Sequence, residues 1–504
     1  MSYARVHSRA LQGIDALPVN IEAHLSGGLP SISIVGVPET AVRESKDRVR
    51  SALLNCGFEF PARRITVNLA PADLPKEGGR FDLGIAISIL AASGQLPGAD
   101  LEGLELLGEL SLTGELRPVR GVLCAALAAG AAARQLVVPP ENAPEALLAA
   151  AGPVLAPARL GELCAHLCGR ETQPAQTAPA QPPVPAPLPD LADVRGQAQG
   201  KRALEIAAAG GHSLLLLGPP GAGKTLLASR LPGLLSPLDS EHALQVAALR
   251  SVSGLPFDPA QWRLRPFRAP HHTASAVALA GGGSVPRPGE ISLAHGGVLF
   301  LDELPEFERR ALEVLREPLE TGHITIARAA RQVVFPARFQ LIAAMNPCPC
   351  GYLGDGSDRC RCTSEAVQRY RARLSGPLLD RIDMHLELPA VPARELLGAA
   401  PGAETSAVVR ERVRAAQGRQ AGRGTLNAQL DGAALERHCA LAPECEQLMV
   451  RAIDRLGLSA RGAHRIIRLA RTIADLAAAD DIAPPHIAEA IGLRVLDRRP
   501  RDRA

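Results

Sequence analysis

The chain has 504 residues, too many for a single hydrophobic core, so two to four domains are expected. Its formal net charge is only +3, which by itself neither demands nor excludes nucleic acid as a partner. Aromatic residues make up 3% of the chain, which argues against a surface on which single-stranded bases stack. Because no uncharged apolar run is long enough to cross a bilayer and the first residues lack a signal-peptide pattern, we expect a soluble cytoplasmic protein.

Residues 1–170 have the pattern of a separate domain of mixed α and β structure. Three segments alternate between apolar and polar residues as strands do, namely 19–25, 31–36 and 65–69. Three others carry apolar residues at helical spacing, namely 39–56, 83–92 and 122–133. Residues 171–190 hold seven prolines and almost nothing to bury, so we expect a semi-extended linker there.

Three stretches of this domain resemble the proteolytic domain of the Lon proteases, which has a ribosomal-S5-like α+β fold: 68–78, 81–86 and 108–119. The resemblance makes a Ser–Lys dyad the feature to check. The positions where the serine would lie hold Gly79, Arg80, Phe81 and Asp82, and those where the lysine would follow hold Val122, Leu123 and Cys124. The domain is therefore predicted to have the fold without the peptidase, and Asp82 to be structural.

A second unit, predicted to span residues 191–395, starts with helical residues 198–209, the apolar strand Ser213–Leu217 and a glycine-rich turn. The turn matches the G-x-x-x-x-G-K-[ST] pattern of a P-loop. Nucleotide contacts are predicted for Gly218, Pro219, Pro220, Gly221, Ala222, Gly223, Lys224, Thr225 and Leu226. The glycines let successive backbone N–H groups point at an anion. Lys224 would reach the outer phosphates of ATP, and the Thr225 hydroxyl would bind Mg²⁺.

Two further apolar strands end in polar residues. The run that begins at Gly297 ends in Asp302 and Glu303, the pattern of a Walker B element, in which Asp302 positions Mg²⁺ and Glu303 polarises the attacking water. Residues 339–345 end at Asn346. In the AAA+ superfamily, which these elements resemble, a polar residue there orients the water or contacts the γ-phosphate. The alternative is that Asn346 caps a turn, because it precedes a proline.

Four of the ten cysteines cluster as two C-x-C pairs, Cys348 with Cys350 and Cys360 with Cys362. Four thiolates around a Gly/Asp-rich loop could enclose a tetrahedral Zn²⁺. The alternative is a group of reduced surface thiols, since C-x-C is less usual in zinc sites than C-x-x-C.

Residues 375–383 resemble the segment with which AAA+ rings present an arginine finger to the neighbouring subunit, and Arg381 is the candidate finger. The alternative is a salt bridge from Arg381 to Asp380 or Asp383. Residues 396–504 are predicted to form a helical lid, in which Arg461 matches the second sensor of that superfamily. The arginines between 410 and 423 indicate a solvated face or a subunit contact. A finger that acts in trans implies a ring.

Two insertions indicate which branch of the AAA+ superfamily the chain resembles. One precedes the Walker B strand and contains His271 and His272, which we interpret as a polar loop cluster rather than as catalytic residues. The other, residues 322–335, is predicted to be a β-hairpin with Arg328 and Arg331 near its tip. Both are marks of the magnesium-chelatase and replicative-helicase branch of AAA+. Together with the Lon-like domain, they make the chain similar to the ComM/YifB group of magnesium-chelatase-like ATPases.

The resemblance implies an α/β P-loop NTPase core with a parallel sheet, and a homo-hexameric ring that hydrolyses ATP with Mg²⁺ and acts on single-stranded or branched DNA. ComM proteins promote branch migration, a helicase activity, while transforming DNA is integrated in natural competence. Hairpins carrying Arg328 and Arg331 into a pore would grip phosphates without reading sequence. Alternatively, these arginines are solvated or bridge subunits.

Two other functions are compatible with single parts of the chain. One is a magnesium-chelatase-like ATPase that remodels a protein partner, although that family's motor lacks the first domain. The other, an ATP-driven protease, is excluded by the missing dyad.

Overall fold

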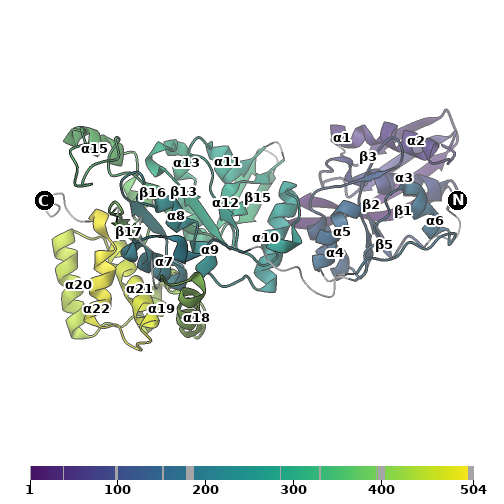
Figure 1. The fold of residues 1–504 in the computed structure, drawn as a ribbon. Coiled ribbons are helices and arrows are strands. Elements are labelled where there is room, and N and C mark those ends of the chain that lie inside the picture. The colour runs from purple at the N-terminus through teal and green to yellow at the C-terminus, as the bar shows by residue number, and fades with distance from the viewer. Residues whose placement is uncertain are drawn as a thin grey trace. The chain divides into compact units, whose positions relative to one another are not determined.

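The computed structural model describes residues 2–37, 39–96, 100–149, 152–177, 187–283, 285–328, 331–392, 394–395 and 403–497. The chain divides into two compact units (Figure 1), Met1–Pro185 with Glu241–Trp262 and Ala186–Ser240 with Arg263–Ala504. Among the described residues, no helix combines the length and apolar character that crossing a membrane requires.

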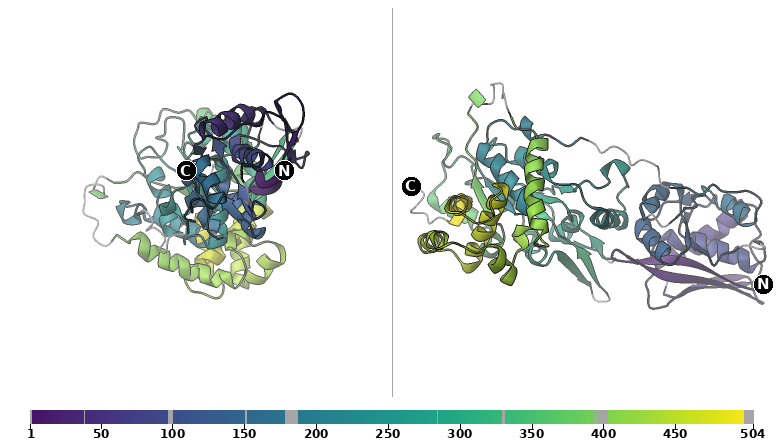
Figure 2. Two further views of the ribbon diagram at one scale, coloured as in Figure 1. Left: turned by 90° about the vertical axis from the view of Figure 1, so that its right-hand side faces the viewer. Right: turned by 90° about the horizontal axis from the view of Figure 1, so that it is seen from below.

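The first unit contains a six-stranded sheet in the order β3-β4-β2-β1-β5-β8. Its strands are β1 (Tyr3–Gln12), β2 (Asp15–Ser26), β3 (Ser31–Val35), β4 (Arg64–Ala70), β5 (Leu104–Leu106) and β8 (Gln135–Val137). Strand β2 pairs antiparallel with both β1 and β4, and β3, β5 and β8 join the sheet in parallel. Figure 2 shows β1 and β2 as a long paired ribbon. The three predicted strands are confirmed as β2, β3 and β4.

Strand β1 was not predicted, because polar residues occupy its buried centre. The guanidinium of Arg9 donates to both carboxylate oxygens of Glu105 at 2.7 Å, and the Ser8 hydroxyl donates to the carbonyl of Leu106 at 2.8 Å. Both side chains are buried. Since each is satisfied by a neighbouring strand, burial does not require the apolar pattern by which strands are recognised.

The helices of the first unit are α1 (Thr40–Arg43), α2 (Ser45–Asn55), α3 (Asp82–Ala92), α4 (Val122–Ala131), α5 (Ala143–Ala146) and α6 (Leu160–Leu167). A two-stranded ribbon, β6 (Glu109–Leu110) with β7 (Leu116–Arg117), completes it. Helix α3 packs on β1 and β2, and α2 packs on α3. One helix was predicted for residues 39–56, but the structure has two, α1 and α2, which are separated at Glu44. The hydroxyl of Ser45, the first residue of α2, donates to buried Asp82 of α3.

A segment from far along the chain completes the core of the first unit. Helix α10 (Ser240–Ser253) buries Ala247, Ala248 and Val252 against the apolar residues of α4. The amide of Gly121 donates to the carbonyl of Ser251 at 3.0 Å. Residues 241–262 therefore belong to the first unit, although they lie between the P-loop and Walker B elements in sequence.

The second unit contains a five-stranded, all-parallel sheet in the order β10-β13-β16-β9-β17. Its strands are β10 (Phe267–Arg268), β13 (Val298–Leu301), β16 (Gln340–Met345), β9 (Leu214–Leu217) and β17 (Met384–Glu387). Strands β9, β13 and β16 are buried throughout, as expected for a sheet covered on both faces. The predicted α/β fold with a parallel sheet is confirmed.

Apart from the 13-residue helix α7, the remaining helices and strands of this unit before residue 400 are short. Before residue 400 they are α7 (Ala198–Gly210), α8 (Lys224–Ala228), α9 (Leu231–Leu234), α11 (Ala276–Ala280), β11 (Gly281–Gly282), β12 (Arg287–Pro288), α12 (Glu290–Leu293), α13 (Arg309–Glu313), α14 (Arg316–Thr321), β14 (His323–Arg328), β15 (Arg331–Pro336), α15 (Ser364–Arg371) and α16 (Gly376–Leu379). The C-terminal helices are α18 (Ser406–Ala421), α19 (Gly432–His438), α20 (Pro443–Leu456), α21 (Ala460–Leu476) and α22 (Pro484–Gly492).

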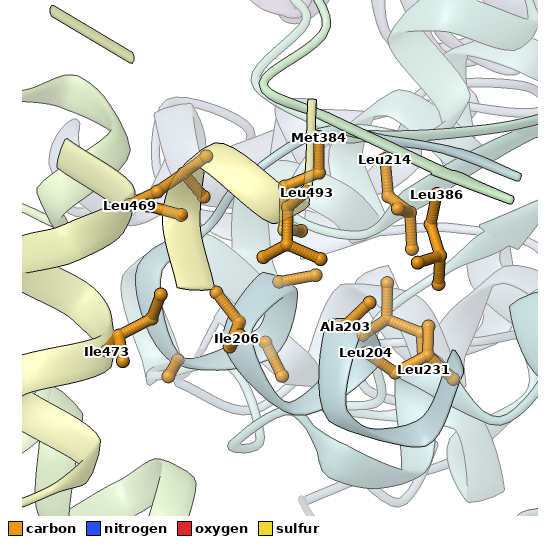
Figure 3. Packing of buried hydrophobic residues seen from close by; sticks show 14 of the residues in the cluster. Ala203, Leu204, Ile206, Leu214, Leu231, Met384, Leu386, Leu469, Ile473 and Leu493 are labelled. Carbon is orange, nitrogen blue, oxygen red and sulfur yellow. The ribbon is translucent and has the colours of Figure 1, made fainter. Parts of the chain in front are cut away.

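The C-terminal helices pack on α7 and share the core of the parallel sheet. In Figure 3, Leu469 and Ile473 of α21 and Ile206 of α7 lie in one cluster with Leu214 of β9. Arginines in α18 and just after it bind residues of the same unit: Arg410 donates to the Gly233 carbonyl, Arg412 pairs with Glu205, and Arg423 pairs with Asp475. These three arginines are therefore internal contacts of the unit.

We expect Ala248→Arg to destabilise the first unit, because the new charge would replace a methyl group that is 4% exposed against α4. Overpacking together with a buried charge should lower the free energy of unfolding by about 2 kcal/mol or more. Glu241→Arg adds an arginine at an exposed position of the same helix and should change it by less than about 0.5 kcal/mol. Denaturant unfolding of the full chain compares the two variants. Equal stabilities would contradict the packing of α10.

Candidate nucleotide site

The P-loop lies at the carboxyl end of β9, which runs between β16 and β17 in the parallel sheet. The amide of Gly218 donates to the carbonyl of Met345 at 3.2 Å, so the loop leaves the sheet beside the end of β16. Gly221 and Gly223 have φ angles of +79° and +85°, which L-residues with side chains rarely adopt. Helix α8 begins directly afterwards, at Lys224. The loop thus has the backbone that the sequence pattern predicts.

The Lys224 ammonium group is folded over this loop. Its Nζ donates to the carbonyls of Gly218 at 2.7 Å and Pro219 at 3.1 Å, and to Oδ1 of Asn346 at 3.0 Å. Burial lowers the pKa of Lys224, and the nearby Asp302 and Glu303 carboxylates oppose that shift. The structure therefore brings Asn346 to the predicted P-loop lysine, where phosphate oxygens could replace both carbonyls as acceptors.

Thr225 and Asp302 bring two hard oxygen ligands to one place. The Thr225 hydroxyl donates to Oδ2 of Asp302 at 2.6 Å. A hydroxyl and a carboxylate that meet at this distance beside a phosphate-binding loop are a donor set that suits Mg²⁺. The residues present thus fit the ion.

Glu303 stands directly after β13 in a left-handed backbone conformation, with φ of +51°. Its amide donates to Oδ1 of Asp302 at 2.9 Å, and its side chain is 51% exposed. Oε2 lies 3.0 Å from Nδ1 of His272, whose ring packs against that of His271 with centroids 4.1 Å apart and planes tilted by 34°. The sequence analysis did not predict this contact. It could have been inferred from the position of His272 shortly after β10, because β10 pairs in parallel with β13, the strand that leads to Glu303.

Arg381 and Arg461 lie at the opposite side of the sheet from the P-loop, at the amino ends of the strands, which we call the amino edge. They line a cavity of about 400 Å³ with residues at the amino ends of the strands, among them Ser213, Gln340 and Asp383. A strand as short as β9 spans roughly 13 Å, so in one chain this arginine cavity and the P-loop are separated by the sheet.

Arg381 makes its ion pair with a residue that the sequence did not suggest. Its side chain is 8% exposed, with Nη2 2.5 Å from Oε1 of Glu320 and Nη1 donating to the carbonyl of Pro377 at 2.7 Å. Asp383 pairs with Arg465 instead, and its pKa is held below the ordinary value by His212 and Arg465 despite burial. The roles predicted for Arg381 and Arg461 remain predictions, and both require a nucleotide bound by another chain.

The predicted hairpin is confirmed as β14 and β15. Arg328 and Arg331 are Cα partners at the end of the ladder. Their side chains lie outside the described part of the structure, so their proposed contact with DNA remains a prediction.

The four clustered cysteines converge in space. Their Sγ atoms all lie within 4.8 Å of one another, and Cys348 is buried. The sequence predicted this grouping from the paired spacing alone.

The positions of the Lon dyad hold structural residues. Asp82 accepts from the guanidinium of Arg48 at 2.7 Å and from the amide of Leu110, and it is buried. Burial raises the pKa of the Cys124 thiol to about 12, so it is not a thiolate at neutral pH. Asp82 and Cys124 thus offer no nucleophile in this part of the first unit.

Three family models match the chain. They are described as "Subunit ChlI of Mg-chelatase" for residues 21–142, "Magnesium chelatase, subunit ChlI" for residues 190–396, and "Magnesium chelatase, subunit ChlI C-terminal" for residues 403–494. The central model covers every element of the candidate nucleotide site.

Full-length relatives are also found. The chain is 51% identical to YifB of Salmonella typhimurium over 99% of this chain and 98% of the relative. It is 50% identical to the competence protein ComM of Haemophilus influenzae, with the same coverage of both chains. A protein of Mycobacterium bovis is 44% identical over 98% of this chain and 99% of its own length.

We expect Lys224→Ala and Glu303→Gln to separate binding from turnover. Without the Lys224 amine, phosphate charge stays unpaired in a half-buried loop, so affinity for ATP with Mg²⁺ should fall by about 100-fold or more. Glu303→Gln leaves the Lys224 and Thr225 contacts intact, so affinity should hold within about threefold. Its turnover should fall by about 100-fold or more, as for other lost general bases. Titration with a fluorescent ATP analogue and phosphate-release assays measure the two effects.

Glu306→Gln is the matched control, since it makes the same chemical change at an exposed residue that pairs with Arg373. It should keep both affinity and turnover. Normal turnover in the Glu303→Gln protein would contradict the Walker B assignment.

Proposed function

Because the chain belongs to the ComM/YifB family of magnesium-chelatase-like AAA+ ATPases, we propose that it is a hexameric ring motor that uses ATP to act on DNA. The observation that carries this proposal is the convergence of Lys224, Thr225 and Asp302 at the carboxyl edge of the parallel sheet. A full-length relative is a competence protein. We therefore place the motor in the cytoplasm, where it acts on single-stranded or branched DNA as a helicase or in branch migration during integration of transforming DNA.

In this proposal the P-loop residues hold the triphosphate and Glu303 activates water. Lys224 exchanges its two carbonyl acceptors for phosphate oxygens and keeps Asn346 beside them. Thr225 and Asp302 would hold Mg²⁺, which would supply positive charge beside the outer phosphates. Glu303, half exposed at the end of β13, accepts a hydrogen bond from the attacking water once His272 releases that oxygen.

The placement of the arginines and the P-loop at opposite ends of the strands supports a ring. Arg381 and Arg461 lie in the arginine cavity, at the amino edge, whereas the P-loop lies at the carboxyl edge. These arginines serve a nucleotide only if the amino edge of one subunit faces the carboxyl edge of the next. Such a head-to-tail contact repeats around a closed ring.

The hairpin β14–β15 supports a DNA-binding role on simpler grounds. The last residue pair of its ladder before the turn is Arg328 with Arg331, and Gln332 and Val334 of β15 are exposed. Guanidinium groups at such a tip bind phosphates of any sequence, as a translocating motor requires.

We expect subunits with complementary defects to restore activity when mixed. Lys224→Ala subunits retain Arg381, and Arg381→Ala subunits retain the P-loop, so a quarter of the interfaces in a randomly mixed ring carry both groups. ATP turnover should therefore recover to about a quarter of the wild-type rate, while each variant alone is inactive. Mixing Arg381→Ala subunits with the double variant Lys224→Ala/Arg381→Ala should restore nothing. Absence of recovery in the first mixture would contradict a role for Arg381 in trans.

We expect single-stranded or branched DNA to stimulate ATP turnover at low salt, with the stimulation fading at moderate salt as phosphate contacts weaken. Arg328→Ala/Arg331→Ala should lose this stimulation and keep the basal rate. The control, Arg414→Ala/Arg437→Ala, removes the same charge from exposed positions of α18 and α19 and should be stimulated normally. Turnover that no DNA changes would instead favour an ATPase that remodels a protein partner.

A further inference from the structure

The loop that follows β16 contains a cluster of sulfur atoms with a metal-binding geometry. The Sγ of Cys348 lies 3.3 Å from that of Cys350 and 3.8 Å from that of Cys360, and Cys350 and Cys360 are 3.7 Å apart. Cys362 completes the group within 4.8 Å. All four are free cysteines, since these separations far exceed a disulfide bond of about 2.05 Å.

These distances fit a tetrahedral zinc thiolate. A Zn–S bond of about 2.3 Å in a tetrahedron separates the sulfur atoms by about 3.8 Å. Four thiols give a closed ligand set with no position left for water, which is the pattern of a structural rather than a catalytic site. Hard ions such as Mg²⁺ prefer oxygen ligands and do not suit it.

The cysteine loop, residues 346–362, contacts the nucleotide site through two residues near its start, Asn346 and Gly351. Asn346 accepts from Lys224 and lies two residues before Cys348. The amide of Gly351 donates to the carbonyl of Cys348 at 3.0 Å, which brings Gly351 onto the P-loop. A Cβ added at Gly351 would lie 2.8 Å from Cδ of Pro220, and its φ of +87° also disfavours any side chain.

We propose that Cys348, Cys350, Cys360 and Cys362 bind one structural Zn²⁺, and that this ion holds the cysteine loop against the P-loop. Binding converts four thiols into thiolates and releases four protons to solvent. The ion joins the two ends of a loop that has little apolar core of its own, so the position of Gly351 against the P-loop depends on it. The second half of the proposal rests on the proposed binding of ATP at the P-loop, whereas zinc binding itself does not.

Metal content tests the site without nucleotide. The full chain, purified without chelator, should carry about one zinc per chain, and so should Cys168→Ser, which removes a partly buried cysteine of the first unit. Cys360→Ser/Cys362→Ser should carry almost none. Cobalt replacing the zinc should give the intense visible absorption of a tetrahedral thiolate in the first two proteins alone. Equal zinc in the double variant, iron in place of zinc, or no metal in the wild type would overturn the site.

The contact with the P-loop is tested by the rate at which a chelator removes zinc. A non-hydrolysable ATP analogue with Mg²⁺ should slow removal by about fivefold, and zinc loss should weaken analogue binding correspondingly, because coupling between two sites is reciprocal. Lys224→Ala should abolish the effect by preventing analogue binding.

Gly351→Ala tests the contact with the P-loop independently of zinc binding. It retains all four cysteines and should retain zinc, but its Cβ pushes the loop away from Pro220, so the analogue should no longer slow removal. A wild-type protein that binds the analogue and yet loses zinc at an unchanged rate would overturn the contact. A wild-type chain that binds zinc but no analogue would instead contradict the proposed ATPase function and leave the zinc site standing.

Discussion

The pairing of β9, β13 and β16 in one parallel sheet is the constraint on which the nucleotide site depends. Leu217 pairs with Met345 and Leu301 with Ala343, so all three strands end at one edge. Residues separated by more than 120 positions, Lys224 and Asn346, thereby come within 3.0 Å, and Thr225 meets Asp302. Because these strands are buried on both faces, a shift of register would expose apolar surface and break the ladder, so the fold holds the polar groups in place.

The same sheet separates two kinds of charge. Its carboxyl edge carries the lysine and carboxylates of the P-loop and Walker B elements, while its amino edge carries the arginine cavity. Inside one chain these groups neutralise nearby partners: Glu320 pairs with Arg381, and Asp383 pairs with Arg465. In an isolated chain Arg381 is thus already paired, and any use of Arg381 on a nucleotide must exchange Glu320 for phosphate.

The connections between the strands determine what surrounds the site. The stretch after the P-loop helices sends residues 241–262 into the first unit before the chain returns to β10 and β13. Here an apolar face that would be exposed on either segment alone, that of α10 or that of α4, is covered by the other. The stretch after β16 instead folds back on the P-loop through Gly351 and gathers the cysteines.

The sequence by itself determined the elements whose signal is local. The P-loop, the apolar strands with their terminal carboxylates, the hairpin and the paired cysteines follow from adjacent residues, since backbone freedom, burial and ligand spacing act over a few positions. The sequence also resembled the family that the comparisons support. Only the tertiary structure decided three features: the buried ion pair of β1, the contact of His272 with Glu303, and the placement of Arg381 and Arg461 on the far edge of the sheet. Each depends on which distant segments become neighbours, and the arginines and histidines involved show no periodicity, because a charged or polar side chain is placed by its partner rather than by a hydrophobic pattern.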